Sequence, residues 1–151
     1  MPGIPVDVTK VAEVDLPCGV RGIVMRLEAG PSYGFIRDVL VRSLGAEMAD
    51  MSPEPEWHSA YAVVPFELAE RLGWSCELGE STPCLAGLPV HGGCTYAKVG
   101  ELREADVPED ALVIGWDYHH GEDRFADYTL EKVCAELREF GEYIRQLAEA
   151  E

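Results

Sequence analysis

The sequence ALVIGW at residues 111–116, followed by TLEKVCAELREFGEYIRQL at residues 129–147, decides the fold class of this chain. The first stretch is a short, unbroken apolar run, which is typical of a buried strand. The second carries apolar residues at spacings of three, four and seven, which predicts a helix with one face against a core. Those residues are Leu130, Val133, Cys134, Leu137, Ile144 and Leu147. Asp127 or Thr129 can cap the start of this helix, and Gly141 weakens its middle by about 1 kcal/mol relative to alanine.

Shorter segments upstream extend this pattern of strands and helices. Apolar and β-branched residues predict strands at residues 20–28, 57–64 and 95–99. A helix is predicted at residues 32–46, with Ser32 as its cap. Another is predicted at residues 66–72, because Pro65 suits a first helical turn and Gly73 can end it. The remaining segments are rich in proline, glycine or charge and are expected to be loops, with residues 1–17 an extended lead-in.

The order of these elements predicts an α+β fold. We expect a mainly antiparallel sheet of about four strands with two to three helices, the long C-terminal helix packing on the sheet. The length of 151 residues suits a single domain over residues 1–151, which can bury roughly two-thirds of its unfolded surface.

The charge of the chain is strongly negative. Asp and Glu number 28 against 12 Lys and Arg, a formal net charge of −16. This balance argues against direct binding of nucleic acid through a broad basic surface, because phosphate contacts need cations. Three interpretations stay open: a solubilising surface, adaptation to high salt, or an acidic decoy that occupies a basic nucleic-acid groove on a partner.

Localisation signals are few. No apolar run approaches the ~20 residues that span a bilayer, and Met1 to Lys10 lacks the pattern of a signal peptide. We therefore expect a cytoplasmic protein without a membrane partner. The five cysteines are irregularly spaced and form no C-x-x-C pair, so free and mostly buried thiols are expected.

Two segments concentrate reactive side chains, at residues 90–96 and 115–123. In the second, Asp117, His120 and Asp123 recur every three residues, directly after the buried strand. We expect His91 to join them if its strand pairs beside that buried strand. Two imidazoles and two carboxylates suit one divalent metal, Zn or Mn, with an open position for water. They also suit a metal-free acid/base site.

Other interpretations of these segments stay open. Gly92 and Gly93 can turn N–H groups toward an anion, or simply form a tight turn. The spacing His91-x-x-Cys94 can make half of a zinc clamp, with Cys84 or Cys76 and His119. Each candidate also has a structural interpretation, for example Asp117 capping a turn.

At these residues the chain resembles a family of small uncharacterised proteins of phages and prophages. The family pattern is H-G-G-L-T-[FY] followed by G-F-D-x-x-H-x-G-D; here the segments read HGGCTY at 91–96 and GWDYHHGED at 115–123. The resemblance covers residues 57–151. It implies that His91, Gly92, Gly93, Thr95, Asp117, His120 and Asp123 belong to one site, with Gly92, Gly93 and Thr95 binding the ligand. It implies no particular reaction.

Two functions follow as hypotheses. The first is a metal-dependent hydrolase, or a binder, of a phosphate-bearing small molecule such as a nucleotide, with His91, Asp117, His120 and Asp123 as metal ligands and catalytic groups. The second is a non-catalytic acidic interaction protein, such as a phage-type accessory protein that inhibits a host protein. In the second hypothesis the His/Asp cluster is structural.

Overall fold

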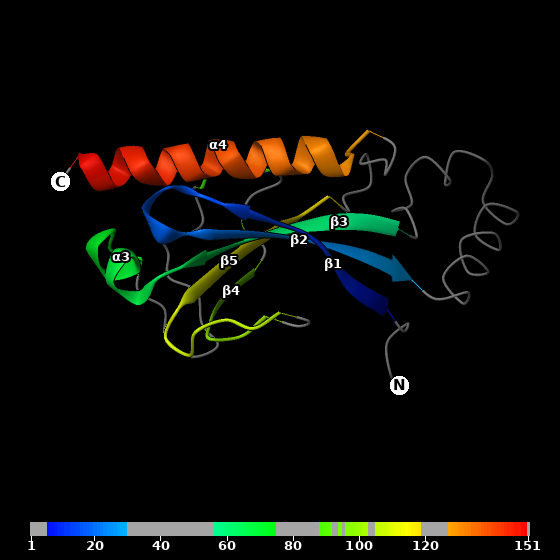
Figure 1. The fold of residues 1–151 in the computed structure, drawn as a ribbon, viewed down its shortest axis with the longest axis horizontal. Helices are drawn as coiled ribbons and strands as arrows, with labels where there is room; N and C mark the ends of the chain where they lie inside the picture. The colour runs from blue at the N-terminus through cyan, green and yellow to red at the C-terminus, as the bar shows by residue number, and fades with distance from the viewer. Residues whose placement is uncertain are drawn as a thin grey trace, which may run out of the picture.

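The computed structural model describes residues 6–29, 56–74, 88–91, 94, 96–102, 105–118 and 127–150. Its five strands form one antiparallel sheet in the order β1-β2-β3-β5-β4. They are β1 (Val6–Asp15), β2 (Arg21–Ala29), β3 (Glu56–Val64), β4 (Tyr96–Val99) and β5 (Leu112–Asp117). The predicted α+β class is therefore confirmed, with one strand more than expected (Figure 1).

Two helices and one short 3-10 turn complete the described elements. The turn η1 (Pro17–Gly19) links β1 to β2, and α3 (Phe66–Arg71) follows β3 directly after Pro65. The long helix α4 (Leu130–Glu149) is capped at its N-terminus by Thr129, whose side-chain oxygen accepts a hydrogen bond from the Lys132 amide at 3.3 Å. Of the two predicted caps, Asp127 and Thr129, the structure therefore confirms Thr129. The helix predicted at residues 32–46 lies outside the described residues.

Residues 1–17 were expected to form only an extended lead-in, but they contain the strand β1, which pairs with β2 from Val6 to Asp15. A bulge at Val11 interrupts the register between Lys10 and Ala12. Val8 therefore packs on one face of the sheet, whereas Ala12 and Val14 pack on the other. The extra residue breaks the simple alternation by which a strand is recognised in a sequence.

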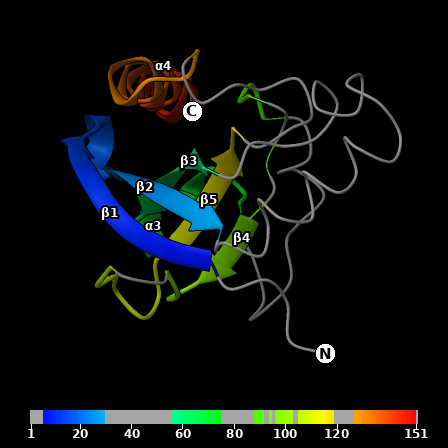
Figure 2. The same ribbon diagram turned by 90° about the vertical axis from the view of Figure 1, so that its right-hand side faces the viewer.

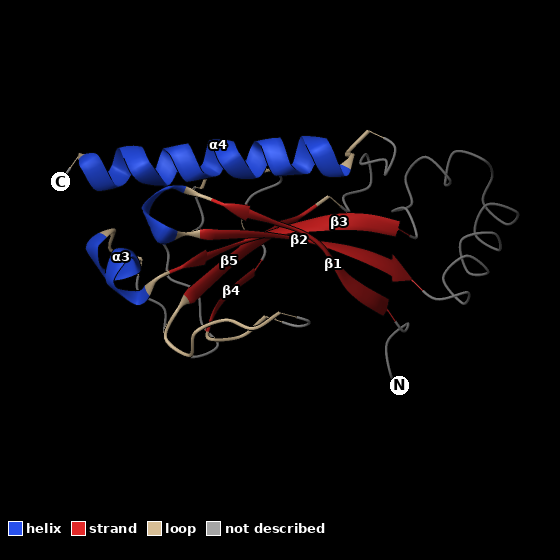
Figure 3. Cartoon of the chain, viewed as in Figure 1, coloured by secondary structure: helices blue, strands red, loops and turns tan. Residues whose placement is uncertain are grey.

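Both faces of the sheet are apolar and each is covered differently. Helix α4 lies across one face, as Figures 2 and 3 show, and its buried side chains meet those of β2, β3 and β5. On the opposite face, Leu102, Ala105 and Val107 from the connection between β4 and β5 pack on Ile23, Met25 and Val113. We call these the helix face and the connection face.

Gly141 has a packing role in the middle of α4. A Cβ atom at this position would lie 2.9 Å from Pro17 Cδ and 3.1 Å from Leu16 Cβ. Glycine therefore lets the helix approach η1 closely, although it lowers intrinsic helix stability by about 1 kcal/mol.

The described cysteines, Cys18, Cys94 and Cys134, are free thiols, as predicted, but only Cys134 is buried, so the expectation of mostly buried thiols is wrong for this part of the chain. No helix in the described ranges combines the length and apolar character needed to cross a bilayer.

Candidate functional site

The two predicted site residues that the structure describes, His91 and Asp117, lie on opposite faces of the sheet. Side chains alternate along β5, and Trp116 packs against Phe140 of α4, so Asp117 projects from the connection face. The His91 ring lies on the helix face, stacked on Tyr118. The structure therefore does not bring these two side chains together, and this pair does not form the predicted common centre.

The other predicted site residues lie outside the described residues: His120, Asp123, Gly92, Gly93 and Thr95. Their assigned roles stay predictions. Within the described ranges, no three His, Cys, Asp or Glu side chains are grouped so that they could hold a metal ion.

On the helix face, His91 belongs to a cluster of three rings. Its imidazole stacks on Tyr118 with the ring centroids 4.6 Å apart and lies 4.7 Å from the Tyr128 ring. The two tyrosine rings are themselves 5.0 Å apart. The Lys132 ammonium stands 4.5 Å from the centroid of Tyr128, so this cluster already binds one cation through a ring face.

His58 of β3 forms hydrogen bonds with the backbone of both tyrosines. Its carbonyl oxygen accepts a hydrogen bond from the Tyr118 amide at 3.0 Å. Its Nδ1 lies 2.9 Å from the Tyr128 carbonyl oxygen, which can only accept, so Nδ1 is the donor. Because His58 is only 5% exposed, it fixes both tyrosines from within the fold.

A chain of hydrogen bonds runs from β5 to α4 beside this cluster. Trp116 Nε1 donates to the Tyr118 hydroxyl at 3.0 Å, and that hydroxyl donates to Glu136 Oε2 at 3.1 Å. Burial raises the pKa of Tyr118 above its ordinary value, and the Glu136 carboxylate raises it further. Tyr118 therefore stays protonated and holds the Glu136 carboxylate in a fixed position.

A cavity of about 240 Å³ opens next to His91, which we call the His91 cavity. Pro89 and Val90 line it together with four side chains that carry rings and two that carry carboxylates. The residues with rings are His91, Trp116, Phe140 and Tyr143, and the carboxylates belong to Glu136 and Glu139. Aromatic faces and carboxylates both attract cations, so this cavity suits an ammonium or guanidinium group.

Cys94 does not have the properties of an activated nucleophile. Its Sγ donates a hydrogen bond to the Tyr96 carbonyl oxygen at 3.2 Å, and burial raises the pKa of its thiol. A raised pKa lowers the thiolate fraction, which is the form that attacks substrates and binds metals.

Asp117 lines a different cavity, of about 260 Å³, on the connection face together with Trp57, Ser59, Tyr61 and Tyr96. The Tyr61 and Tyr96 rings meet edge to face at 5.5 Å. A Cβ atom at Gly115 would lie 2.5 Å from Tyr61 Cδ1, so glycine is what lets this ring cross β5. Burial raises the pKa of Tyr61, and the charge of Asp117 adds to the rise.

Sequence analysis missed most of the residues around the His91 cavity. Glu136, Glu139, Phe140 and Tyr143 have the spacing i, i+3, i+4 and i+7, which places them on one side of α4. That spacing was a usable signal. The apolar stripe alone explains the helix, so its pattern gives no reason to single out the charged and aromatic residues.

Comparisons with known proteins identify no relative. A scan of protein-family models, a search of curated proteins and a search of solved structures each gave no match. Any functional inference therefore depends on this chain's own residues.

Proposed function

We propose that this chain is a non-catalytic interaction protein that binds a positively charged group of a partner protein in the His91 cavity. The observation that carries the proposal is the composition of that cavity, where Glu136 and Glu139 are lining residues together with aromatic side chains. An arginine side chain fits this chemistry well, because its planar guanidinium stacks on rings and pairs with carboxylates.

The net charge of −16 supports the same choice. A strongly negative protein attracts a basic partner over long distances and speeds its association, and salt weakens this attraction. A host protein with a basic surface is therefore the partner class that we propose.

The metal-dependent hydrolase is the less well supported hypothesis. It requires His91 and Asp117 at one Zn or Mn ion, and these side chains project from opposite faces of the sheet. The carboxylates of the His91 cavity would also repel the phosphate of a nucleotide.

The proposal predicts that Glu139→Gln weakens binding of a hexaarginine peptide by about tenfold, because one carboxylate of the cavity loses its charge. Glu139 is exposed on α4, so this change leaves the core intact. Isothermal titration calorimetry at physiological ionic strength measures the effect.

The matched control is Glu131→Gln, which removes the same charge from an exposed position in the first turn of the same helix. Its affinity for the peptide is expected to fall by less than about twofold. Equal losses in the two variants would contradict the proposal, because they would show attraction to net charge alone.

A further inference from the structure

Phe66 is unusual among the large apolar side chains that the structure describes. It is 50% exposed, and only Leu130 joins it as an exposed large hydrophobic residue within the described ranges. Phe66 is the first residue of α3, directly after Pro65, so its backbone is held at the junction between β3 and the helix. A single exposed aromatic ring is common on protein surfaces, so the meaning of Phe66 depends on the cavities that lie beside it.

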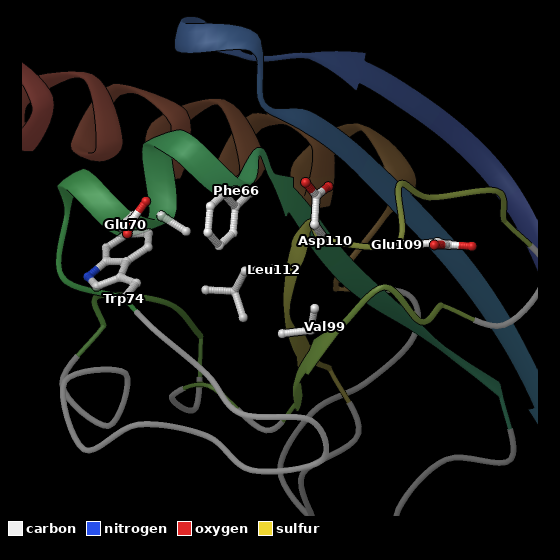
Figure 4. A pocket seen from close by; sticks show the side chains of 8 residues that line it. Phe66, Glu70, Trp74, Val99, Glu109, Asp110 and Leu112 are labelled. Carbon is white, nitrogen blue, oxygen red and sulfur yellow. The ribbon is translucent and has the colours of Figure 1, made fainter.

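Beside Phe66 lies a cavity of about 310 Å³ with an apolar floor. Figure 4 shows the side chains of Trp74, Val99 and Leu112 around this hollow, with the Phe66 ring at its upper edge. Trp74 is 5% exposed and its ring is nearly parallel to Phe140, with the centroids 6.3 Å apart. The floor is therefore part of the packed core and is preformed.

Carboxylates flank this apolar floor on two sides. Glu70, Glu109 and Asp110 line the cavity, although the Glu109 side chain points away from the hollow in Figure 4. Among the lining residues that the structure describes, none is Lys or Arg. In Figure 4, Glu70 and Asp110 stand on either side of the Phe66 ring. A ligand at this position must therefore offer apolar surface and positive charge together.

A second cavity, of about 260 Å³, adjoins the first on the other side of Phe66. Phe66 and Asp110 line both cavities, so they form the ridge between them. The cation in the second cavity, Arg21, is already engaged: its Nε donates to Glu13 at 2.7 Å and its Nη1 to the Asp106 carbonyl oxygen at 2.9 Å. We call the two cavities together the Phe66 groove.

We infer that the Phe66 groove docks a segment of a basic partner protein that presents a large apolar side chain next to an arginine. This inference depends on the proposed function, since both require a basic protein partner. The apolar side chain would fill the cavity over Trp74, and the arginine would lie against Asp110 and the Phe66 ring.

The size and charge of the groove favour this occupant over others. Each cavity lies near or below the lower end of the roughly 300–1,000 Å³ range of small-molecule pockets, so single side chains fit better than a drug-sized ligand. A second copy of this chain carries a net charge of −16 and is repelled.

The test uses the full chain and the probe peptide acetyl-Arg-Leu-Arg-amide, with acetyl-Glu-Leu-Glu-amide as the matched control peptide. Isothermal titration calorimetry is expected to show binding of the arginine peptide only.

Phe66→Ala and Asp110→Asn are each expected to weaken this binding by about tenfold. Leu130→Ala, which truncates the other exposed hydrophobic residue, is expected to change it by less than twofold. Both Phe66 and Asp110 are exposed, and unchanged melting temperatures verify folding.

The outcomes separate this inference from the proposed function. If Glu139→Gln loses binding of acetyl-Arg-Leu-Arg-amide and Phe66→Ala does not, the inference is overturned and the proposed function stands. Loss in Phe66→Ala with no loss in Glu139→Gln would support the groove and contradict the His91 cavity. Binding of both peptides, binding of neither, or self-association of the chain that Phe66→Ala abolishes would overturn the docking of a basic segment.

Discussion

Replacing Leu137 by alanine is expected to lower the free energy of unfolding by about 2–5 kcal/mol, which is the usual cost of removing a buried leucine side chain. Leu137 is completely buried at the middle of α4. Its Cδ1 lies 3.4 Å from the position that a Cβ atom would take at Gly22 of β2, so the side chain packs directly on the sheet. The surrounding strands are hydrogen-bonded and cannot collapse into the space that alanine leaves.

Leu130→Ala is the matched control, because it makes the same substitution on the same helix at a position 37% exposed. We expect a loss of less than about 1 kcal/mol there, since little apolar area is buried. Urea denaturation of both variants measures the difference. Equal losses would contradict the packing of α4 on the helix face.

Gly141→Ala is expected to destabilise the protein by about 1–3 kcal/mol, although alanine is the better helix former. The added Cβ would lie 2.9 Å from Pro17 Cδ and 3.1 Å from Leu16 Cβ, so α4 and η1 must move apart. Intrinsic helix propensity alone predicts the opposite sign, a gain of about 1 kcal/mol. The sign of the change in unfolding free energy therefore separates the two effects.

A double-mutant cycle with Pro17→Ala tests whether contact with η1 causes the loss of stability in Gly141→Ala. Removing Pro17 Cδ relieves the shortest contact, so Gly141→Ala is expected to cost less in that background, with a coupling of about 0.5–3 kcal/mol. Additive effects of the two substitutions would show that the glycine is not required by η1.

Most strands and the long helix could be predicted because their patterns have one simple period. The apolar and β-branched residues of β2 and β3 and the apolar run of β5 predict strands within a residue or two of the observed bounds. The strand β1 could not be predicted in this way. Its bulge at Val11 shifts the alternation by one residue, and the prolines on both sides resemble loop signals.

The candidate site was predicted only in part. Since Trp116 is apolar and buried, strand alternation already implied that Asp117 points to the opposite face. The position of His91 could not be obtained from the sequence, because the residue precedes β4 and has no strand register of its own. Its partners, Tyr118 and Tyr128, are brought beside it by the hydrogen bonds of His58, which join residues 60 and 70 positions apart.

The most direct test of the proposed function is a map of where a basic ligand binds. Backbone amide chemical shifts of the ¹⁵N-labelled full chain, recorded during titration with the hexaarginine peptide, provide it. We predict saturable shifts around the His91 cavity, at Val90, His91, Glu139 and Tyr143. Shifts confined to Ser59, Tyr61 and Asp117 on the connection face, or small changes spread over the whole acidic surface without saturation, would contradict binding at the His91 cavity.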